Sequence, residues 1–243
     1  LRCRTVPLQW SALLRPGREM LRRFVHYSAP VLANETLWGV GYSLITVIMG
    51  HMAGNTDLIS AYTVAGSIDK LSTAGIYGIA NAASVIVGKE IGIGSRESVV
   101  RIGKAVCLTA FLFALALGGV ELLAFLTLLR PYVLPLFSLS AGAAAMCAVM
   151  VYCYAGVMPL HGFSSTMVVG VLRGGGDVRA SLLIDNFPLW CVELPLMCLL
   201  GLVLKVPNEM FCLCIAIEHL AKTPVGLWRI HSGKWVHDIT RSD

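Results

Sequence analysis

The stretch Ala29–Gly50, APVLANETLWGVGYSLITVIMG, is apolar over about the thickness of a membrane and contains a single acid, Glu35. A helix needs about 20 apolar residues to cross a bilayer, so the stretch predicts a transmembrane helix. An ionisable side chain inside such a helix is rare and costly, which makes it a candidate functional residue. If the protein is a transporter, Glu35 is the first residue to consider for coupling transport to a cation.

The composition of the whole chain is that of a helical membrane protein. The 243 residues are 56% hydrophobic and only 14% charged, and the mean hydropathy is +0.75. Soluble domains carry about 25% charged residues. The net charge of +5 does not require a nucleic acid partner, because Lys and Arg collect in the cytoplasmic loops of membrane proteins.

Five further apolar stretches follow the first one, and turn or loop sequences separate them. The six predicted spans are Pro30–Met52, Leu58–Gly88, Ala105–Leu129, Ala143–Leu172, Ala180–Leu204 and Met210–Trp228. We predict that residues 30–228 form one all-α membrane unit of six transmembrane helices. Residues 1–29 are expected to be a cytoplasmic linker with a short amphipathic helix at Arg18–Tyr27, and residues 229–243 a cytoplasmic tail.

The loops of this predicted unit carry their basic residues on one side of the membrane. Fifteen of the 19 Lys and Arg residues lie in the N-terminal segment, the loop Lys89–Lys104, the turn Arg173–Arg179 and the C-terminal tail. On the other side, the loop Arg130–Gly142 and the turn Lys205–Glu209 hold one basic residue each. Because basic loops stay in the cytoplasm, we expect both termini to be cytoplasmic, in the inner (plasma) membrane of the cell.

A polar and aromatic stripe runs along the first predicted helix. Glu35, Trp38, Tyr42 and Thr46 follow one another at helical spacing, so they share one face. A carboxylate beside aromatic rings suits a cation, which is attracted by the acid's charge and by the ring quadrupole. We expect Glu35 to bind the coupling cation and Trp38 and Tyr42 to line a substrate cavity. The alternative is an acid satisfied by a neighbouring helix.

A longer polar stripe on the second predicted helix contains Lys70, Thr73, Tyr77 and Asn81. Its length predicts the wall of a water-lined substrate cavity, although polar contacts between helices would give the same pattern. The neighbour of Lys70 in the sequence, Asp69, points about 100° away, so each is expected to have a partner on another helix. Asp69 is a second candidate for cation coupling.

The fifth and sixth predicted helices also contain ionisable residues. Asp185 lies near the cytoplasmic end of the fifth, and Glu193 lies between two prolines. Because kinked helices in membranes are tolerated where they face protein or a cavity, Asp185 is a third cation-coupling candidate and Glu193 a cavity candidate. Glu218 and Lys222 have the spacing and order of a structural ion pair. His161, in the fourth predicted helix, is expected to be buried and hydrogen-bonded.

No motif for catalysis or for a cofactor is found in the sequence. The turn Arg173–Arg179, RGGGDVR, lacks the lysine and the preceding strand of a phosphate-binding loop. No nucleophile and base pair, metal-ligand motif or nucleotide fingerprint occurs elsewhere. We expect a protein that is not an enzyme, has no cofactor and binds no metal other than Na⁺ at Glu35.

Five segments of the chain, in order, are NETLWGVGYSL, AYTVAGSIDKL, GIANAASVIVGKEIG, VLRGGGDVRASLLIDNFPLW and EHLAKTPVGLWRIHSGKWVHDIT. Their order, spacing and turn sequences resemble the helices in the C-terminal half of multidrug and toxic compound extrusion (MATE) transporters. The resemblance covers residues 18–240. It implies one lobe of a pseudo-symmetric twelve-helix transporter that exchanges Na⁺ or H⁺ for a small organic cation such as a drug or metabolite.

The resemblance also implies a role for one residue. Glu35 matches the acid in the first helix of this lobe, which is a cation-site residue in one branch of the family. That branch has an Asp in the fourth helix, where this chain has no acid. The partner of Glu35 is therefore expected to be Asp69, Asp185 or a residue of the other lobe. The implied partners of the chain are membrane lipid and the missing N-terminal lobe or a second copy.

Two other functions fit the same fold. A lipid or polysaccharide flippase of the same superfamily would use a larger and more basic cavity, and the shortage of Lys and Arg inside the spans argues against it. A non-transporting truncated fragment would need no cavity. Because the sequence begins at Leu1 rather than Met, a piece of a longer protein is among the expectations.

Overall fold

The computed structural model describes residues 17–237, and six helical segments in this part of the chain are long and apolar enough to cross a membrane. These segments are Arg18–Gly50, Asn55–Ile93, Arg96–Phe137, Ala141–Leu172, Val178–Val203 and Asn208–Ser232. The predicted all-α membrane fold with six transmembrane helices is therefore confirmed. Parts of the predicted linker and tail, residues 1–16 and 238–243, lie outside the described residues.

The spans are built from α-helices that are joined, within a span, by π-helical or 3₁₀ segments. The elements are α2 (Arg18–Gly50), α3 (Asn55–Ile93), α4 (Arg96–Ala124), η1 (Phe125–Val133), η2 (Leu134–Phe137), α5 (Ala141–Ser165), η3 (Thr166–Leu172), α6 (Val178–Pro188), η4 (Leu189–Glu193), α7 (Leu194–Cys198), η5 (Leu199–Val203), α8 (Asn208–Phe211), η6 (Cys212–Ala216) and α9 (Ile217–Ser232).

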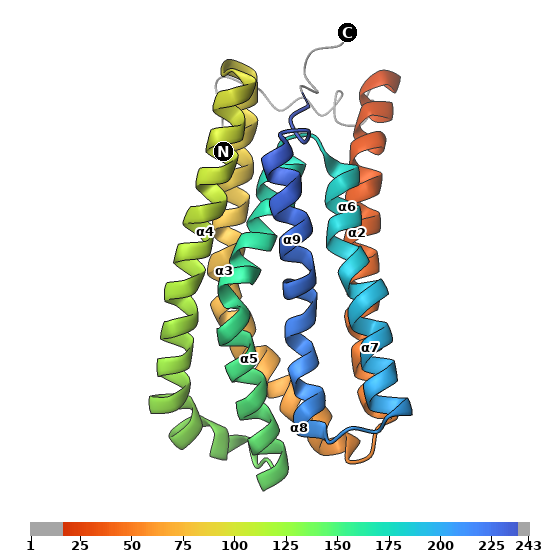
Figure 1. The fold of residues 1–243 in the computed structure, drawn as a ribbon, viewed down its shortest axis with the longest axis vertical. Coiled ribbons are helices and arrows are strands. Elements are labelled where there is room, and N and C mark those ends of the chain that lie inside the picture. The colour runs from red at the N-terminus through yellow and green to blue at the C-terminus, as the bar shows by residue number, and fades with distance from the viewer. Residues whose placement is uncertain (1–16, 238–243) are drawn as a thin grey trace.

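The helices form two groups that stand side by side (Figure 1). In one group α3, α4 and α5 pack against one another, and in the other α2 packs along α6 and α7. α9 packs against both α5 and α6, so it joins the groups in the middle of the bundle. The start of α2 and the end of α9 lie at the same end of the bundle, here called the termini end (Figure 1).

The first span is longer than the sequence predicted. The amphipathic helix expected at Arg18–Tyr27 is not a separate element, because α2 runs without a break from Arg18 to Gly50. Pro30 lies inside α2 and does not end it. A proline removes one backbone donor from the hydrogen-bond ladder, and a long apolar helix absorbs that loss when its other residues favour helix.

Two segments that were predicted to be loops are mostly helical. Within the expected loop Lys89–Lys104, α3 continues to Ile93 and α4 begins at Arg96. The Ser95 hydroxyl accepts a hydrogen bond from the Ser98 backbone N–H at 3.3 Å, which caps α4. The expected loop after Arg130 is occupied by η1 and η2. Polar residues in the first segment, and Pro131 and Pro135 in the second, therefore made the predicted helices too short, because a helix continues readily through residues that reach water.

The fifth span passes through both of its prolines without a break. Its backbone ladder instead widens into two π-helical segments, η4 at Leu189–Glu193 and η5 at Leu199–Val203. A π-helical turn within an α-helix relaxes the hydrogen bonding that a proline disturbs, and such turns are frequent at functional sites. Glu193 is the last residue of η4.

Small residues allow α4 and α5 to approach closely. A Cβ atom placed on Gly162 would lie 2.8 Å from the Ala110 backbone oxygen, and one on Gly118 would lie 2.7 Å from that of Ala155. Interfaces of this kind are typical of membrane helices, where packing rather than water exclusion holds helices together. α4 and α5 therefore form one closely packed side of the bundle.

The segment after α9 is not a solvated tail. α9 extends to Ser232, and the side chain of Trp235 is fully buried at the termini end. Its ring fills the space above Gly103 and Gly175, and its indole N–H donates to the Ile230 carbonyl at 3.3 Å. The last helix therefore ends later than the predicted Trp228, and one aromatic residue of the polar segment after it packs into the core.

Candidate functional site

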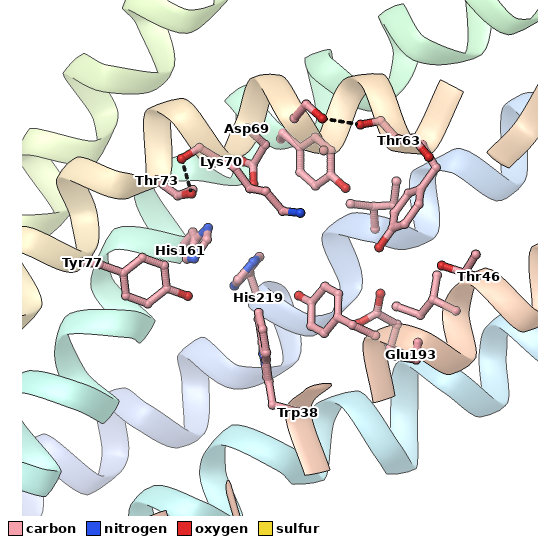
Figure 2. Close-up of a pocket in the computed structure, with 18 residues that line it drawn as sticks. Trp38, Thr46, Thr63, Asp69, Lys70, Thr73, Tyr77, His161, Glu193 and His219 are labelled. Atoms are coloured by element: carbon pink, nitrogen blue, oxygen red, sulfur yellow. Dashed lines mark hydrogen bonds between the residues drawn. The ribbon is translucent and has the colours of Figure 1, made fainter. Parts of the chain in front are cut away.

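A cavity of about 450 Å³ lies inside the bundle between α2, α3, α5, η4 and the start of α9 (Figure 2). Its wall is rich in rings and also contains two acids and one lysine. The rings belong to Trp38, Tyr42, Tyr62, Tyr77, Tyr154, His161 and His219. The charged residues are Asp69, Lys70 and Glu193. A cavity of this size is in the range of small-molecule sites.

The two acids of this large cavity have no ion-pair partner within the described residues. Glu193 is only 3% exposed, and its Oε2 atom has no hydrogen-bond partner. A buried polar atom without a partner is costly and calls for an explanation such as a ligand or an ion. Asp69 enters the same cavity from α3, next to Lys70 (Figure 2).

Two imidazole rings stack on one side of the large cavity. The centroids of His161 and His219 are 4.4 Å apart with an angle of 20° between the ring planes. Tyr77 meets His161 edge to face at 6.2 Å. The Ser164 hydroxyl lies 3.4 Å from His219 Nδ1. His161 was expected to be buried and hydrogen-bonded, whereas the structure shows it half-buried and held by ring stacking.

A smaller cavity of about 70 Å³ adjoins the large one and shares five of its lining residues. Its wall contains a network of charged groups centred on Lys222. The Lys222 ammonium lies 2.7 Å from Asp185 Oδ1 and 2.5 Å from Glu218 Oε1. Glu218 and Lys222 form the ion pair that their spacing predicted, but Asp185 on α6 joins them, which the spacing could not show.

Neutral donors from other helices complete this network. The Tyr42 hydroxyl donates to Glu218 Oε2 at 2.7 Å, and the Asn34 amide donates to Asp185 Oδ2 at 2.8 Å. The Asn186 amide in turn donates to Asn34 Oδ1 at 2.7 Å. The network therefore links α2, α6 and α9. We call these residues the lysine network: Asn34, Tyr42, Asp185, Asn186, Glu218 and Lys222.

Glu35 lies at the edge of the smaller cavity and is paired with a base. Its Oε1 atom is 2.7 Å from an Arg173 guanidinium nitrogen, and its side chain is 56% exposed. The same turn carries Asp177, which accepts a hydrogen bond from Arg229 Nε of α9 at 2.8 Å. Neither Asp69 nor Asp185, the partners expected within this chain, contacts Glu35 directly, because the turn after η3 brings Arg173 there first.

Most, but not all, of the residues in the predicted polar stripes line one of the two cavities. Six of the seven residues predicted to line a substrate cavity do line the large one: Trp38, Tyr42, Lys70, Thr73, Tyr77 and Glu193. Asn81 does not, because it lies one turn beyond Tyr77 on an exposed part of α3. Of the three cation-coupling candidates, Asp69 lines the large cavity, whereas Glu35 and Asp185 line the small one.

Several residues of the site escaped the sequence reasoning. His219 sits beside Glu218, and its position on the same helix as a recognised ion pair was a usable signal. Asn34, next to Glu35, was visible as an amide inside an apolar stretch. Tyr62 and Tyr154 gave no signal beyond their chemistry, because neither belongs to a stripe or an ionisable pair that the sequence analysis identified.

Comparisons with known proteins agree with this architecture. The MatE family model matches residues 30–199. No curated protein matches the chain. A structure described as the crystal structure of a MATE mutant aligns with a TM-score of 0.75 and 20% identity, over 90% of this chain and 48% of that chain.

Two conformations of similar transporters also match. A structure described as the outward-facing conformation of a multidrug resistance MATE family transporter has a TM-score of 0.75 and 20% identity, over 90% of this chain and 49% of that chain. One described as the inward-facing conformation has a TM-score of 0.72 and 20% identity, over 90% and 50%. The chain therefore spans about half the length of the solved structures it matches.

Proposed function

The chain belongs to the MatE family, and we propose that it forms one six-helix lobe of a secondary antiporter that exports organic cations in exchange for Na⁺ or H⁺. The family and the helices that could span a membrane identify a multi-pass membrane protein of a transporter family. The cargo, the coupling ion and the assembly are our proposals.

The observation that carries the proposal is the large cavity with its two unpaired acids. Asp69 and Glu193 enter it from different helices, and neither has an ion-pair partner among the described residues. Acids kept in a membrane interior usually face a wet cavity and mark an ion or substrate path. The same cavity is lined by aromatic faces such as those of Trp38 and Tyr77, which attract a cation through their quadrupoles. A small organic cation would meet both kinds of attraction at once.

We propose that the coupling cation binds at Glu35, Asp185 or Asp69, the last of which also faces the cargo. Glu35 and Asp185 line the small cavity, which adjoins the large one, and Asp69 in the large cavity provides a third carboxylate. A cation that binds among these acids changes the charge of the interior at the place where the cargo binds. Exchange then follows from competition, because two positive charges close together in a low-dielectric site repel each other.

The complete transporter requires a second lobe in this proposal. The described part of the chain presents large apolar side chains over much of its surface, which suits lipid and a facing lobe. We propose that the chain works with an N-terminal lobe or with a second copy, in the plasma membrane and with both termini in the cytoplasm. The isolated, monomeric chain is expected not to transport, and uptake of an organic cation into vesicles containing it alone would contradict this.

The test of the proposed function is the Glu35→Gln variant in the complete protein. A Na⁺ or pH gradient would be imposed across inverted membrane vesicles, and ethidium would serve as the transported organic cation. Gradient-driven ethidium transport should be abolished while expression and folding stay intact. Glu97→Gln, at an exposed acid at the start of α4, is the matched control and should transport normally. Unchanged transport by Glu35→Gln, with its ion dependence intact, would remove Glu35 from the coupling site.

A further inference from the structure

The lysine network holds a positive charge where two acids converge in the membrane interior. The side chains of Lys222 and Glu218 are 5% and 2% exposed, and that of Asp185 is 13% exposed. Two acids from different helices therefore point at a single ammonium that belongs to the same chain.

Each oxygen of the two acids has one donor. Lys222 serves Asp185 Oδ1 and Glu218 Oε1, while Asn34 serves Asp185 Oδ2 and Tyr42 serves Glu218 Oε2. The neutral donors thus orient the carboxylates and leave one oxygen of each directed at the position of the ammonium. Without the lysine, the structure would present two oriented carboxylate oxygens around an empty position.

The charges of the network do not cancel. Two carboxylates and one ammonium leave a net charge of −1, while the neighbouring charged pair, Glu35 with Arg173, is neutral. A ligand also has a path to these acids, because their side chains line the small cavity beside the large one. The lysine network therefore combines an excess of negative charge with access from a cavity.

We propose that Asp185 and Glu218 form a binding position for a monovalent cation, and that the Lys222 ammonium is a tethered occupant of it. A free cation reaches the carboxylates by displacing this ammonium, which swings on its four-carbon stem toward the cavity. Lys222 thereby sets the affinity of the position by competing for it. The link to transport rests on the proposed function, but the existence of the position does not.

The test is to replace the tethered ammonium by a free one. In Lys222→Ala, n-propylammonium supplies the atoms that the truncation removes. The unfolding temperature of the purified full chain in detergent would be measured with n-propylammonium chloride and with choline chloride at equal ionic strength. We expect n-propylammonium to raise the midpoint of Lys222→Ala by about 5 °C, as saturating binding to a native site does.

Three controls define the site. The unsubstituted chain and Lys222→Arg, which keep a tethered cation, should not respond. Lys89→Ala, at an exposed lysine of α3, should behave like the unsubstituted chain. Asp185→Asn added to Lys222→Ala should abolish the response. An equal shift in all of these chains, or none in Lys222→Ala, would overturn the proposal.

A second variant decides the matter if Lys222→Ala does not fold. Lys222→Gln keeps most of the volume of the side chain, and its probe is Na⁺ compared with choline. We expect Na⁺ to stabilise Lys222→Gln and not the unsubstituted chain, and a lack of any Na⁺ effect on Lys222→Gln would reject the cation position. Because unfolding is measured without transport, a failure of organic cation transport would contradict the proposed function and leave this result unaffected.

Discussion

The carboxylates that line the two adjoining cavities differ in whether they have an ion-pair partner. In the small cavity every acid has a basic partner: Glu35 pairs with Arg173, and Asp185 and Glu218 share Lys222. In the large cavity Asp69 and Glu193 have no ion-pair partner within the described residues. The described part of the chain therefore gives each acid of the small cavity a basic partner, with one lysine shared between two acids, and gives the acids of the large cavity no such partner.

The energetics of burial give this difference a meaning. A buried ion pair adds little net stability, yet removing one partner is strongly destabilising because it leaves an uncompensated charge. A lone buried acid is the reverse case, since it costs stability until something binds it. Side chains of the lysine network are thus expected to contribute to stability as well as to the proposed cation binding, and the acids of the large cavity to contribute to binding alone.

The largest difference between the two cavities is expected in the free energy of unfolding when one acid is removed from each. Glu218→Leu leaves Lys222 paired with Asp185 alone and the Tyr42 hydroxyl without its acceptor, so it should lower the free energy of unfolding by about 1–3 kcal/mol. Glu193→Leu removes an acid whose Oε2 atom has no partner, so it should leave stability unchanged or raise it. Thermal or denaturant unfolding of the two purified variants measures this. Equal losses in both would erase the distinction between the cavities.

Binding of the organic cation, unlike stability, should depend more on Glu193 of the large cavity than on the lysine network. Glu193→Gln removes a charge that would contact an organic cation, and a charge-assisted contact is worth about 1.5–3 kcal/mol, or roughly 10- to 100-fold in affinity. Binding of tetraphenylphosphonium to the complete protein measures the loss. Asn81→Ala, on the same polar stripe as Tyr77 but outside the cavity, is the control and should bind normally. A comparable loss in Asn81→Ala would place the cargo elsewhere.

The rings of the large cavity should contribute less than its acids. Tyr77→Leu removes a cation–π contact worth about 0.5–2 kcal/mol, which weakens tetraphenylphosphonium binding by roughly 2- to 30-fold. Tyr77→Phe keeps the ring face and should bind nearly as the unsubstituted protein does. If Tyr77→Phe loses as much affinity as Tyr77→Leu, the hydroxyl rather than the ring face makes the contact.

The smallest effect is expected at the pair that reaches water. Arg173→Gln breaks the contact with Glu35, whose side chain is 56% exposed, and exposed pairs contribute about 0–1 kcal/mol. The unfolding temperature should fall by no more than about 4 °C. A loss of stability as large as that of Glu218→Leu would contradict this, because it would mean that the Glu35–Arg173 pair contributes as much as the buried pairs of the lysine network.

The fold could be predicted from the sequence because the membrane imposes a simple rule. A span must be apolar over a set length, and that rule identified all six spans. It could not find their ends, because a helix continues past the apolar region until a residue such as Gly94, which follows α3, ends it. Nor could it foresee Trp235 in the core, since the space above Gly103 and Gly175 exists only in the folded bundle.

Residues of the candidate site could be predicted where spacing along one helix places them on a common face. They were missed where the contact depends on how two helices are placed. Trp38 with Tyr42, and Thr73 with Tyr77, share faces by helical spacing, and all four line the large cavity. Pairs such as Glu35 with Arg173 depend on how helices are rotated and where a turn ends, which spacing within one helix does not contain. Asn81 fits the same stripe but lies too far along α3 to reach the cavity.

The turn after η3 holds two helices by charges that differ in their contact with water. Arg173 pairs with the exposed Glu35 of α2, and Asp177, nearly buried, pairs with Arg229 of α9. At physiological salt the Debye length is about 8 Å, and screening weakens exposed pairs far more than buried ones. Rising ionic strength therefore loosens the turn from α2 before it loosens it from α9. Rising salt thus eases the contact beside the small cavity first.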